Sequence, residues 1–588
     1  MSQIACIILA YLILKAFAVI ALAFRLSPKT RNFSLSIVFG WIGVNLVINS
    51  LLLLASVFQS VSNVIIWISL IMIIGLNISF IDPKKILDTF NKCPHSKNLP
   101  IIFALAITVG LLYRSLYFYD TSWDALVYGM PRLGFWVSSE SLFLHYPTEV
   151  VNIFANEWNA ELLALSGWLV TGSSMGALAG SVETWLLGFF CVIAALRELG
   201  TSRNLSIYIS LLILTSPICL GLAMAIKGDL LAALLISVGF FTLCSTSGDR
   251  LHRTAWSISV ISFAAGAKVT TIPIAGLLIA YGIFVLFQLK AGLKLIAILT
   301  LGCSIALSRY FVNLVVYSNP LKRVDGEKTF FGWNTMSENI RGISTKLLEM
   351  NIQTPGYELG VMGMGGGLLS FFTLLCLISG FLRQSPAPKL PTAPLVSLFV
   401  GSLFILSSIP WQPWSLRYHL AWIIPGIIII IVFGLNGRIR SWLVSLVCSV
   451  IIAICGFQWY TAWRSQEAFP VSFREARNQN YLERKLASHP YLISEVIEEI
   501  NSGIPGPLVV FNRPDSAIWP LFGERKLNQL ILVDSLSALE DTCSNSSAAV
   551  AIIGGTSVSG DEVTIRGLIS SGFVLREQTV FWTILVRE

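Results

Sequence analysis

The sequence is poor in charge, in histidine and in paired cysteines, and each shortage excludes a class of protein. Only 12% of its 588 residues are charged, 55% are hydrophobic, and the mean hydropathy is +0.75. These values exclude a water-soluble protein for most of the chain. The five histidines are too few and scattered for a zinc site with histidine spacing or a Ser-His-Asp triad. The ten cysteines form no Cys-x-x-Cys pair, and most fall in apolar runs, where we expect them to pack.

Long apolar runs fill the first three quarters of the chain. We count about fourteen of them between Ile4 and about Tyr460, each long enough to cross a hydrocarbon core of roughly 30 Å. The first run is followed by further spans, so we expect a permanent anchor and not a cleaved signal peptide. The formal net charge of +8 does not indicate nucleic acid, because the basic residues are dispersed over short loops. The predicted fold is a polytopic α-helical membrane protein, with three helices in residues 1–99 and a core in residues 100–461.

The basic residues predict the orientation of the helices. By the positive-inside rule, the loops after the first and third spans face the cytoplasm, because they contain Arg25, Lys29 and Arg31, and Lys84, Lys85, Lys92 and Lys97. The alternation then assigns to the cytoplasmic side the following pairs: Arg197 and Arg203, Arg250 and Arg253, Lys290 and Lys294, Arg383 and Lys389, and Arg438 and Arg440. This alternation requires that residues 160–176 do not cross. We therefore predict a helix lying in the outer interface there, with Trp158, Glu161 and Trp168.

Two large loops are predicted on the outer face, at residues 117–176 and 313–360. Everything after about residue 461 is predicted to lie on that side as well. In residues 462–588 charges become frequent, and "PLVVFN", "QLILVD" and "AAVAIIGG" are short β-branched runs typical of a small parallel sheet. "FVLREQTVFWTILVRE" predicts a closing hairpin. We expect a small extracytoplasmic α/β domain, and "IIGGTSVSG" lacks the spacing of a nucleotide-binding loop.

Ionisable residues near the outer ends of the spans are the candidates for chemistry. Charges are expensive to bury in a bilayer, so those that remain usually pair or line a polar cavity. The set consists of Asp120, Asp124, Glu161, Glu183, Lys227, Asp229, Lys268, Arg309 and Arg417. Carboxylates and cations at one depth suit a reaction on a substrate that carries a phosphate. The alternative is that these groups only neutralise one another.

Six segments resemble one enzyme superfamily. They are "DTSWDALVYGMPRLGFW", "NEWNAELLALSGW", "KGDLLAALL", "AAGAKVTTIPI", "RYFVNLVVYSNP" and "WQPWSLRYHL". Their order and membrane positions resemble the GT-C glycosyltransferases, most of all the protein O-mannosyltransferase and aminoarabinose-transferase branch. The resemblance covers residues 100–460. It implies an inverting enzyme that takes a sugar from a polyprenyl-phosphate donor in the outer leaflet of the plasma (inner) membrane. The acceptor would be a glycan, lipid or protein.

The resemblance also implies roles for individual residues. An aspartate in the first outer loop is the expected base, and Asp124 with Tyr128 keeps the spacing of that motif. Ala125 stands where the branch has a glutamate, and Gly129 where the closest relatives have a histidine, so Asp120 competes with Asp124. Substrate-binding candidates are Tyr128, Arg132, Glu161, Glu183, Lys227, Asp229, Lys268, Arg309, Arg417 and Tyr418. Arg417, framed by Trp411, Trp414 and Tyr418, could stack on a sugar or bind phosphate. The sequence indicates no particular cofactor, and the need for a divalent cation stays open.

Two rival functions fit the same composition. A transporter or flippase for a lipid-linked sugar would also need charged residues within the bilayer. No internal repeat is detectable here, however, and the charges cluster on one side. A protein that binds glycolipid without catalysis is the second rival, since Ala125 and Gly129 depart from the motif.

Overall fold

The structure of the chain is a computed structural model in which most of the helical part and the C-terminal sheet are described. It describes residues 2–81, 99–117, 125–143, 157–223, 225–245, 248–321, 332–348, 368–382, 390–412, 415–436, 448–450, 452, 507–511, 530–533, 535–545, 548, 550–554, 561–578 and 582–587.

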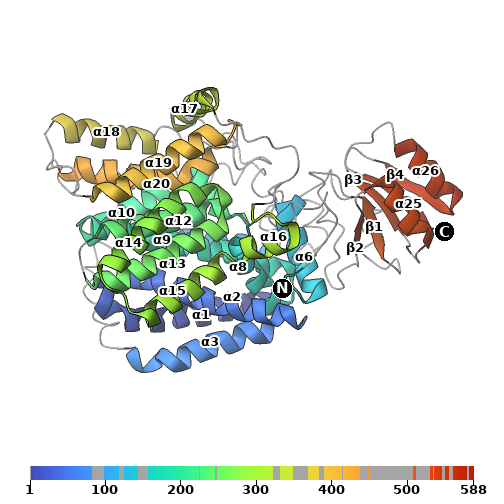
Figure 1. Cartoon of the computed structure of the whole chain (residues 1–588), viewed down its shortest axis with the longest axis horizontal. Helices are drawn as coiled ribbons and strands as arrows, with labels where there is room; N and C mark the ends of the chain where they lie inside the picture. Colours follow the sequence, from blue (N-terminus) through green and yellow to red (C-terminus); the bar gives the residue numbers. More distant parts are fainter. Residues whose placement is uncertain are drawn as a thin grey trace.

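Helices make up the first part of the chain (Figure 1). The long ones are α1 Ser2–Thr30, α2 Phe33–Val57, α3 Asn63–Asn77, α5 Leu99–Tyr117, α9 Ala179–Glu198, α12 Gly228–Cys244, α13 Arg250–Ala267, α14 Ile272–Gln288, α17 Trp333–Leu348, α18 Leu368–Leu382, α19 Thr392–Ser408 and α20 Leu416–Asn436. The shorter ones are α6 Met130–Ser139, α8 Asn159–Thr171, α10 Arg203–Leu214, α11 Pro217–Ala223, α15 Leu293–Ala306 and α16 Ser308–Tyr317, with single turns η1 Ile78–Phe80, η3 Ala125–Gly129, η5 Ser174–Leu178 and η6 Val269–Thr271.

The chain is an integral membrane protein by the length and composition of its helices. Among the described residues, six helices are long and apolar enough to cross a membrane, and a seventh span exists if α15 and α16, bent by 61°, are counted as one. Four further apolar helices have 10–17 residues. The predicted number of about fourteen spans is therefore not confirmed for the described part of the chain.

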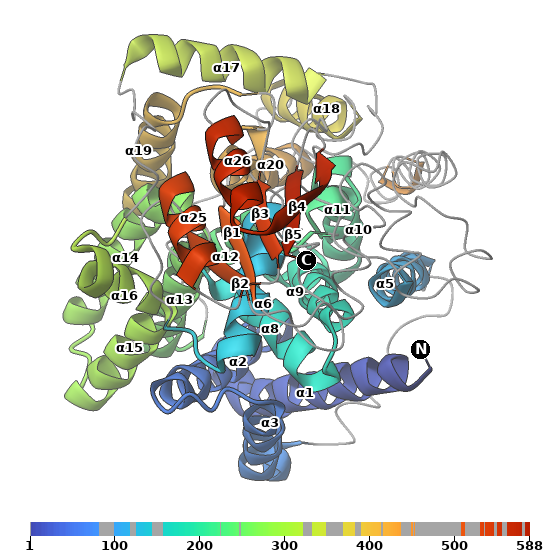
Figure 2. The ribbon, with the colours of Figure 1, turned by 90° about the vertical axis from the view of Figure 1, so that its right-hand side faces the viewer.

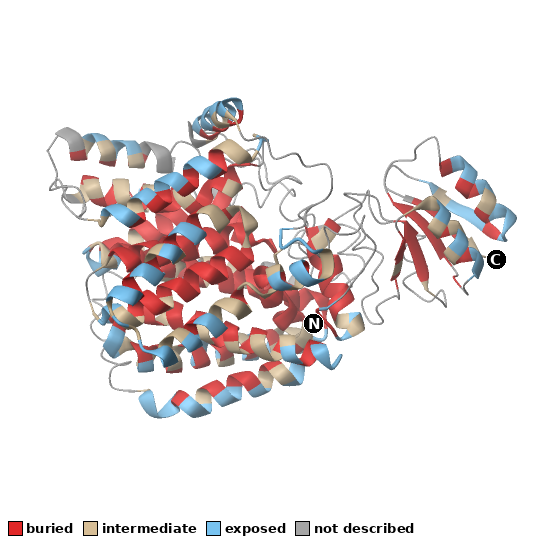
Figure 3. Cartoon of the chain, in the orientation of Figure 1, coloured by how far each residue is buried: buried red, intermediate tan, exposed pale blue. Residues whose placement is uncertain are grey.

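Helix α12 is the centre of the helical part. All 17 of its residues are buried, and it packs against α9, α13 and α20. A helix that is apolar all round is stable only when other helices or lipid surround it, and here the neighbours are helices. Figure 3 shows buried residues concentrated in this middle layer, while α3 and α18 at the periphery are more exposed.

The first three helices belong to the same packed body. Helix α2 contacts both α1 and α9, and α1 contacts α8. A Cβ added at Gly40 of α2 would overlap the Val19 carbonyl of α1, so the absent side chain lets the two backbones meet. The structure therefore integrates residues 2–80 into the helical core.

Helix α8 corrects the expectation of a helix lying in the outer interface. Eleven of its 13 residues are buried, Trp168 and Glu161 among them. At 1.5 Å per residue it is about 20 Å long, too short to cross a bilayer alone. The interfacial position is predicted from the alternation of basic loops, which requires that this segment does not cross. In the structure the protein itself surrounds α8, so the helix lies inside the fold and not on its surface.

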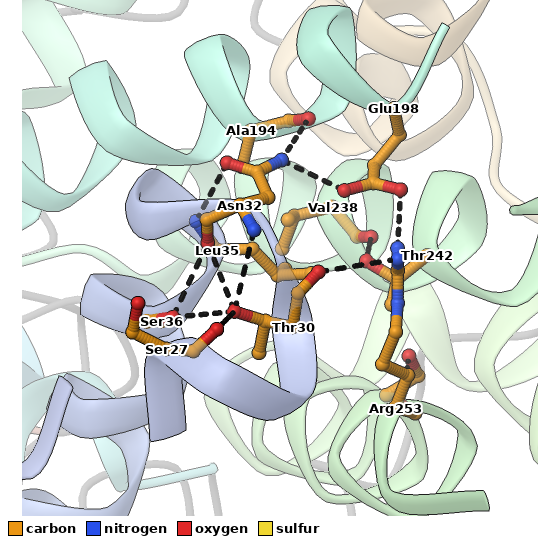
Figure 4. Close-up of polar contacts among 11 residues, drawn as sticks. Ser27, Thr30, Asn32, Leu35, Ser36, Ala194, Glu198, Val238, Thr242 and Arg253 are labelled. Atoms are coloured by element: carbon orange, nitrogen blue, oxygen red, sulfur yellow. Dashed lines mark hydrogen bonds and ion pairs between the residues drawn. The ribbon is translucent and has the colours of Figure 1, made fainter. Parts of the chain in front are cut away.

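Polar contacts join three of the predicted cytoplasmic loops at one end of the helices (Figure 4). Asn32 donates to Glu198 Oε1 at 2.7 Å, and Glu198 forms an ion pair with Arg253. Nearby, Lys29 Nζ lies 2.8 Å from His252 Nε2. The turns after α1, α9 and α12 therefore meet in space, an arrangement compatible with their predicted position on one side of the membrane. Arg253 lies near the start of α13 and Lys268 directly follows its end. The two residues are therefore fifteen positions apart, about 22 Å along the helix axis.

The C-terminal sheet has five strands in the order β2-β1-β3-β5-β4. Its elements are β1 Leu508–Phe511, β2 Leu530–Val533, α25 Leu536–Asn545, β3 Val550–Gly554, α26 Asp561–Ser570, β4 Phe573–Gln578 and β5 Trp582–Arg587. Strand β1 pairs in parallel with β2 and β3, while β5 runs antiparallel between β3 and β4. The predicted parallel strands and closing hairpin are confirmed, whereas the predicted boundary at residue 462 lies outside the described residues.

Candidate active site

Glycines bring three helix ends together at the end of α13 opposite Arg253. A Cβ at Gly228, the first residue of α12, would overlap the Ala267 carbonyl at the end of α13. A Cβ at Gly266 would overlap the Ala306 carbonyl and the Asn159 amide. Asn159 of α8 donates to that carbonyl at 2.9 Å and to the Phe263 carbonyl at 3.1 Å. These contacts fix where the polar side chains of α8, α12 and the α13 end can lie.

Lys268 lies between two carboxylates at this junction. Its Nζ is 3.4 Å from Asp229 Oδ1 and 3.6 Å from Glu157 Oε1. Asp229, in the first turn of α12, has a side chain only 1% exposed, and within the described part of the chain neither of its oxygens has a hydrogen-bond partner. Because a buried carboxylate without a cation is strongly unfavourable, the Lys268 ammonium is required here.

Arg132 and Glu161 form a second buried pair beside the first. Arg132 of α6 is 1% exposed; its Nη1 lies 3.3 Å from Glu161 Oε1 and donates to the Glu157 carbonyl at 2.9 Å. Glu161 occupies the first turn of α8, where the helix dipole favours a negative charge. Arg132 also lies over the Trp136 ring. This pair therefore ties α6 to the start of α8.

Arg309 of α16 is buried without a carboxylate partner. It is 2% exposed, its Nε and Nη2 have no hydrogen-bond partner, and the described residues place no carboxylate within 4 Å of it. Its guanidinium carbon lies 5.0 Å from the centroid of the Trp158 ring, and Trp158 packs edge-on against Trp136. The Tyr317 side chain hydrogen-bonds to the Arg309 guanidinium, but Nε and Nη2 keep no partner among the described residues. Burying unused donors of a guanidinium is costly, so this position is suited to an anion from outside the chain.

Arg417 and Tyr418 complete the cluster from the start of α20. Arg417 is 7% exposed, and its Nη2 donates to the Tyr418 hydroxyl at 3.0 Å. Lys268 Nζ lies 5.4 Å from the centroid of the same ring, and the Arg417 guanidinium lies 5.0 Å from it. Tyr418 therefore holds two cations close to one another.

We call these residues the charged cluster: Arg132, Glu157, Glu161, Asp229, Lys268, Arg309, Arg417 and Tyr418. Its cations outnumber its carboxylates four to three. The helices that supply it, α6, α8 and α16 among them, lie at the end of the helical part that faces the sheet domain in Figure 1. In Figure 2, viewed from that end, α6 and α8 lie behind the sheet. An excess of buried cations at low dielectric can bind a phosphate and stabilise negative charge that grows on it.

The structure brings together most of the predicted site residues. Glu161, Asp229, Lys268, Arg309, Arg417, Arg132 and Tyr418 all belong to the charged cluster. Tyr128 lies in the π-helical turn η3 that leads into α6, and Lys227 directly precedes α12. The two candidate bases, Asp120 and Asp124, lie outside the described residues, as does Trp414.

Glu183 is the exception, because its contacts lie at a different helix interface. Its Oε2 lies 2.6 Å from Lys15 Nζ of α1, and Tyr11 donates to its Oε1 at 3.1 Å. Both ionic side chains are nearly inaccessible. Lys15 neutralises Glu183 at the interface of α1 and α9, so Glu183 has a structural partner apart from the charged cluster.

Sequence reasoning missed Glu157 and Lys15. Glu157 is within "NEWNAELLALSGW", four residues before Glu161, so the i, i+4 spacing could have indicated it. Lys15 is a single lysine inside an apolar span, and such a residue usually has a buried partner. Among the residues that the structure describes, no group of three or more His, Cys, Asp or Glu side chains could hold a metal ion.

Comparisons with known proteins give little beyond a likeness of shape. No protein-family profile matches this chain, and no curated protein matches it. Two matching solved structures are crystal structures of ArnT from Cupriavidus metallidurans, one in the apo state and one bound to undecaprenyl phosphate. They are 12% and 14% identical to this chain, cover 82% and 83% of it and 97% and 98% of their own chains, and both have a TM-score of 0.49. At that TM-score the likeness does not establish a shared function, which must rest on the residues described above.

Proposed function

We propose that this chain is a membrane glycosyltransferase of the GT-C type that moves a sugar from a polyprenyl-phosphate donor to an acceptor on the extracytoplasmic side. The observation that carries the proposal is Arg309, a buried guanidinium with two unused nitrogens and no carboxylate within 4 Å among the described residues. A phosphate would satisfy both its charge and its donors. Arg132, Lys268 and Arg417 provide further positive charge in the same charged cluster.

The chemistry follows from this charge distribution. The acceptor hydroxyl or amine attacks the anomeric carbon while the bond from that carbon to the phosphate oxygen breaks. Asp124, or Asp120 in its place, removes the acceptor proton, a contribution of about 10²- to 10⁴-fold in rate. The electron pair of the broken bond stays on the polyprenyl phosphate, and the cations of the charged cluster stabilise it without donating a proton. Attack opposite the leaving phosphate inverts the anomeric configuration.

The carboxylates have a supporting part in this proposal. Asp229 and Glu157 hold the Lys268 ammonium from two sides, and Glu161 holds Arg132. Cations fixed in this way need no rearrangement when charge develops on the leaving phosphate, which is the basis of electrostatic preorganisation. Mutual neutralisation of opposite charges is sufficient to explain these ion pairs. It does not explain Arg309, which has no carboxylate within 4 Å among the described residues.

One assay separates this function from its two rivals. Purified protein is incubated in vesicles with a radiolabelled polyprenyl-phosphate sugar, together with candidate acceptors. Release of undecaprenyl phosphate with transfer of the sugar supports the proposal. Movement of intact lipid across the vesicle, without cleavage, would identify a flippase, and retention of uncleaved lipid would identify a glycolipid-binding protein.

A further inference from the structure

Helix α17 is set apart from the spans by its direction and composition. In Figure 1 it is seen end-on above α19, and in Figure 2 it lies lengthwise along the top of the helical part. It is not among the helices long and apolar enough to cross a membrane. Three buried residues at a spacing of four, Thr335, Asn339 and Ile343, form its inner side. Trp333 and Ile340 on the other side are 76% and 49% exposed.

The inner side of α17 packs on the connection between α19 and α20. A Cβ at Gly342 would overlap the Trp411 ring in that connection. Asn339 is completely buried, and its Nδ2 donates to the carbonyls of Leu406 at 2.9 Å and Ile409 at 2.6 Å. These carbonyls are at the C-terminal end of α19, where a helix leaves acceptors without partners. The Asn339 amide therefore caps α19 from another helix.

The same amide reaches the first turn of α20 through a histidine. Asn339 Oδ1 lies 3.3 Å from His419 Nε2, and Trp422 Nε1 lies 3.3 Å from His419 Nδ1. An indole N–H can only donate, so Nδ1 accepts and His419 carries its hydrogen on Nε2, where it donates to Asn339. His419 is completely buried. One amide therefore determines both the end of α19 and the orientation of His419.

We propose that Asn339 is a positioning residue for the phosphate-binding cations, acting through His419 on Arg417 and Tyr418. This inference rests on the proposed function. His419 directly follows Tyr418 in the chain, and the Tyr418 hydroxyl accepts the hydrogen bond from Arg417. Replacing Asn339 by leucine removes the amide from the Leu406 and Ile409 carbonyls and the acceptor from the His419 N–H. The first turn of α20 then loses its fixed position, and the Arg417 guanidinium moves away from the phosphate.

The test compares Asn339→Leu with Asn334→Leu, the same change on the exposed side of the same helix. Binding of undecaprenyl phosphate to the purified full chain is measured with each variant, and again in an Arg417→Lys background. We expect Asn339→Leu to weaken binding about tenfold, and less than about twofold once Arg417 is already altered, since coupled residues are not additive. Asn334→Leu should leave binding unchanged.

A structural readout separates failure of this inference from failure of the proposed function. In ¹⁵N-histidine NMR spectra, the His419 signal, assigned with His419→Gln, should report a ring protonated on Nε2 in the wild type and a mixture of tautomers in Asn339→Leu. A wild-type protein that does not bind the lipid would refute the proposed function. An unchanged His419 signal, unaltered lipid affinity, or equal losses in both Arg417 backgrounds would refute the role of Asn339.

Discussion

Lys15 of α1 and Glu183 of α9 form a buried ion pair, with Nζ 2.6 Å from Oε2 and side chains only 3% and 6% exposed. Lys15 also donates to the Tyr11 hydroxyl at 3.0 Å. This pair joins the first helix to the core across 168 residues of sequence. Glu183 therefore has a cationic partner within the protein, apart from the charged cluster.

Lys15→Met should destabilise the protein, because it leaves Glu183 buried without a cation. The expected loss in free energy of unfolding is about 3 kcal/mol, typical of a broken buried pair. Thermal unfolding in detergent measures it. The double change Lys15→Met with Glu183→Leu should recover much of the loss, since two apolar groups replace the pair. A double variant less stable than Lys15→Met alone would contradict this account.

Arg309→Gln should abolish donor binding by removing the charge that faces the phosphate. We expect a loss of at least about 100-fold in sugar transfer, in the range of a lost transition-state donor. Arg250→Gln is the matched control, because Arg250 is an exposed arginine at the opposite end of α13. Transfer rates with a radiolabelled donor measure both variants. Wild-type activity in Arg309→Gln would contradict the proposed role of Arg309 in binding the phosphate.

Asp124→Asn should reduce sugar transfer by about 10²- to 10⁴-fold while the protein stays folded, because an amide cannot take the acceptor proton. Asp120→Asn is the companion variant and should retain most activity. Single-turnover transfer with saturating donor measures the chemical step in both. The opposite order of effects would identify Asp120 as the base.

A cysteine introduced as Ser138→Cys should react with an impermeant maleimide only from the outer side of the membrane. Ser138 is exposed near the end of α6, close in sequence to Arg132 of the charged cluster. A cysteine introduced as Ser202→Cys, exposed beside the turn that contains Glu198, should react only from the cytoplasm. Labelling of intact cells, with the exposed Cys6 replaced by serine, provides the measurement. The reverse pattern would invert the proposed topology.

Cys543 of the sheet domain should be unreactive at neutral pH. Burial raises the pKa of its thiol to about 11, although Arg587 acts in the opposite direction. The folded protein therefore holds this proton more tightly than the unfolded chain, whose thiol has a pKa of about 8.5. Stability from this group is complete below about pH 8.5 and is lost as the pH rises towards 11. Thiol titration of the full chain from pH 7 to 11 measures the reactivity of Cys543. Rapid labelling of native Cys543 at pH 8 would contradict the raised pKa.

Local patterns in the sequence were sufficient for several features. The strands β1, β2 and β3 and the β4–β5 hairpin follow from short β-branched runs and their spacing, because strand formation in a small sheet depends on which residues can be buried. The sequence also predicted that the loops after the first and later spans share one side of the membrane, and in the structure Asn32, Glu198 and Arg253 of three such turns are in contact.

Other features depended on contacts between distant segments. The sequence identified Glu161, Lys268, Arg309 and Arg417 as costly charges, because their residue types and apolar surroundings are local properties. Only the tertiary structure decided that Glu183 pairs with Lys15, that α8 is enclosed by protein, and that none of the described carboxylates lies within 4 Å of Arg309. The physical reason is that the partner of a buried charge is set by helix packing across more than a hundred residues, through close approaches such as that at Gly266, and no local periodicity encodes it.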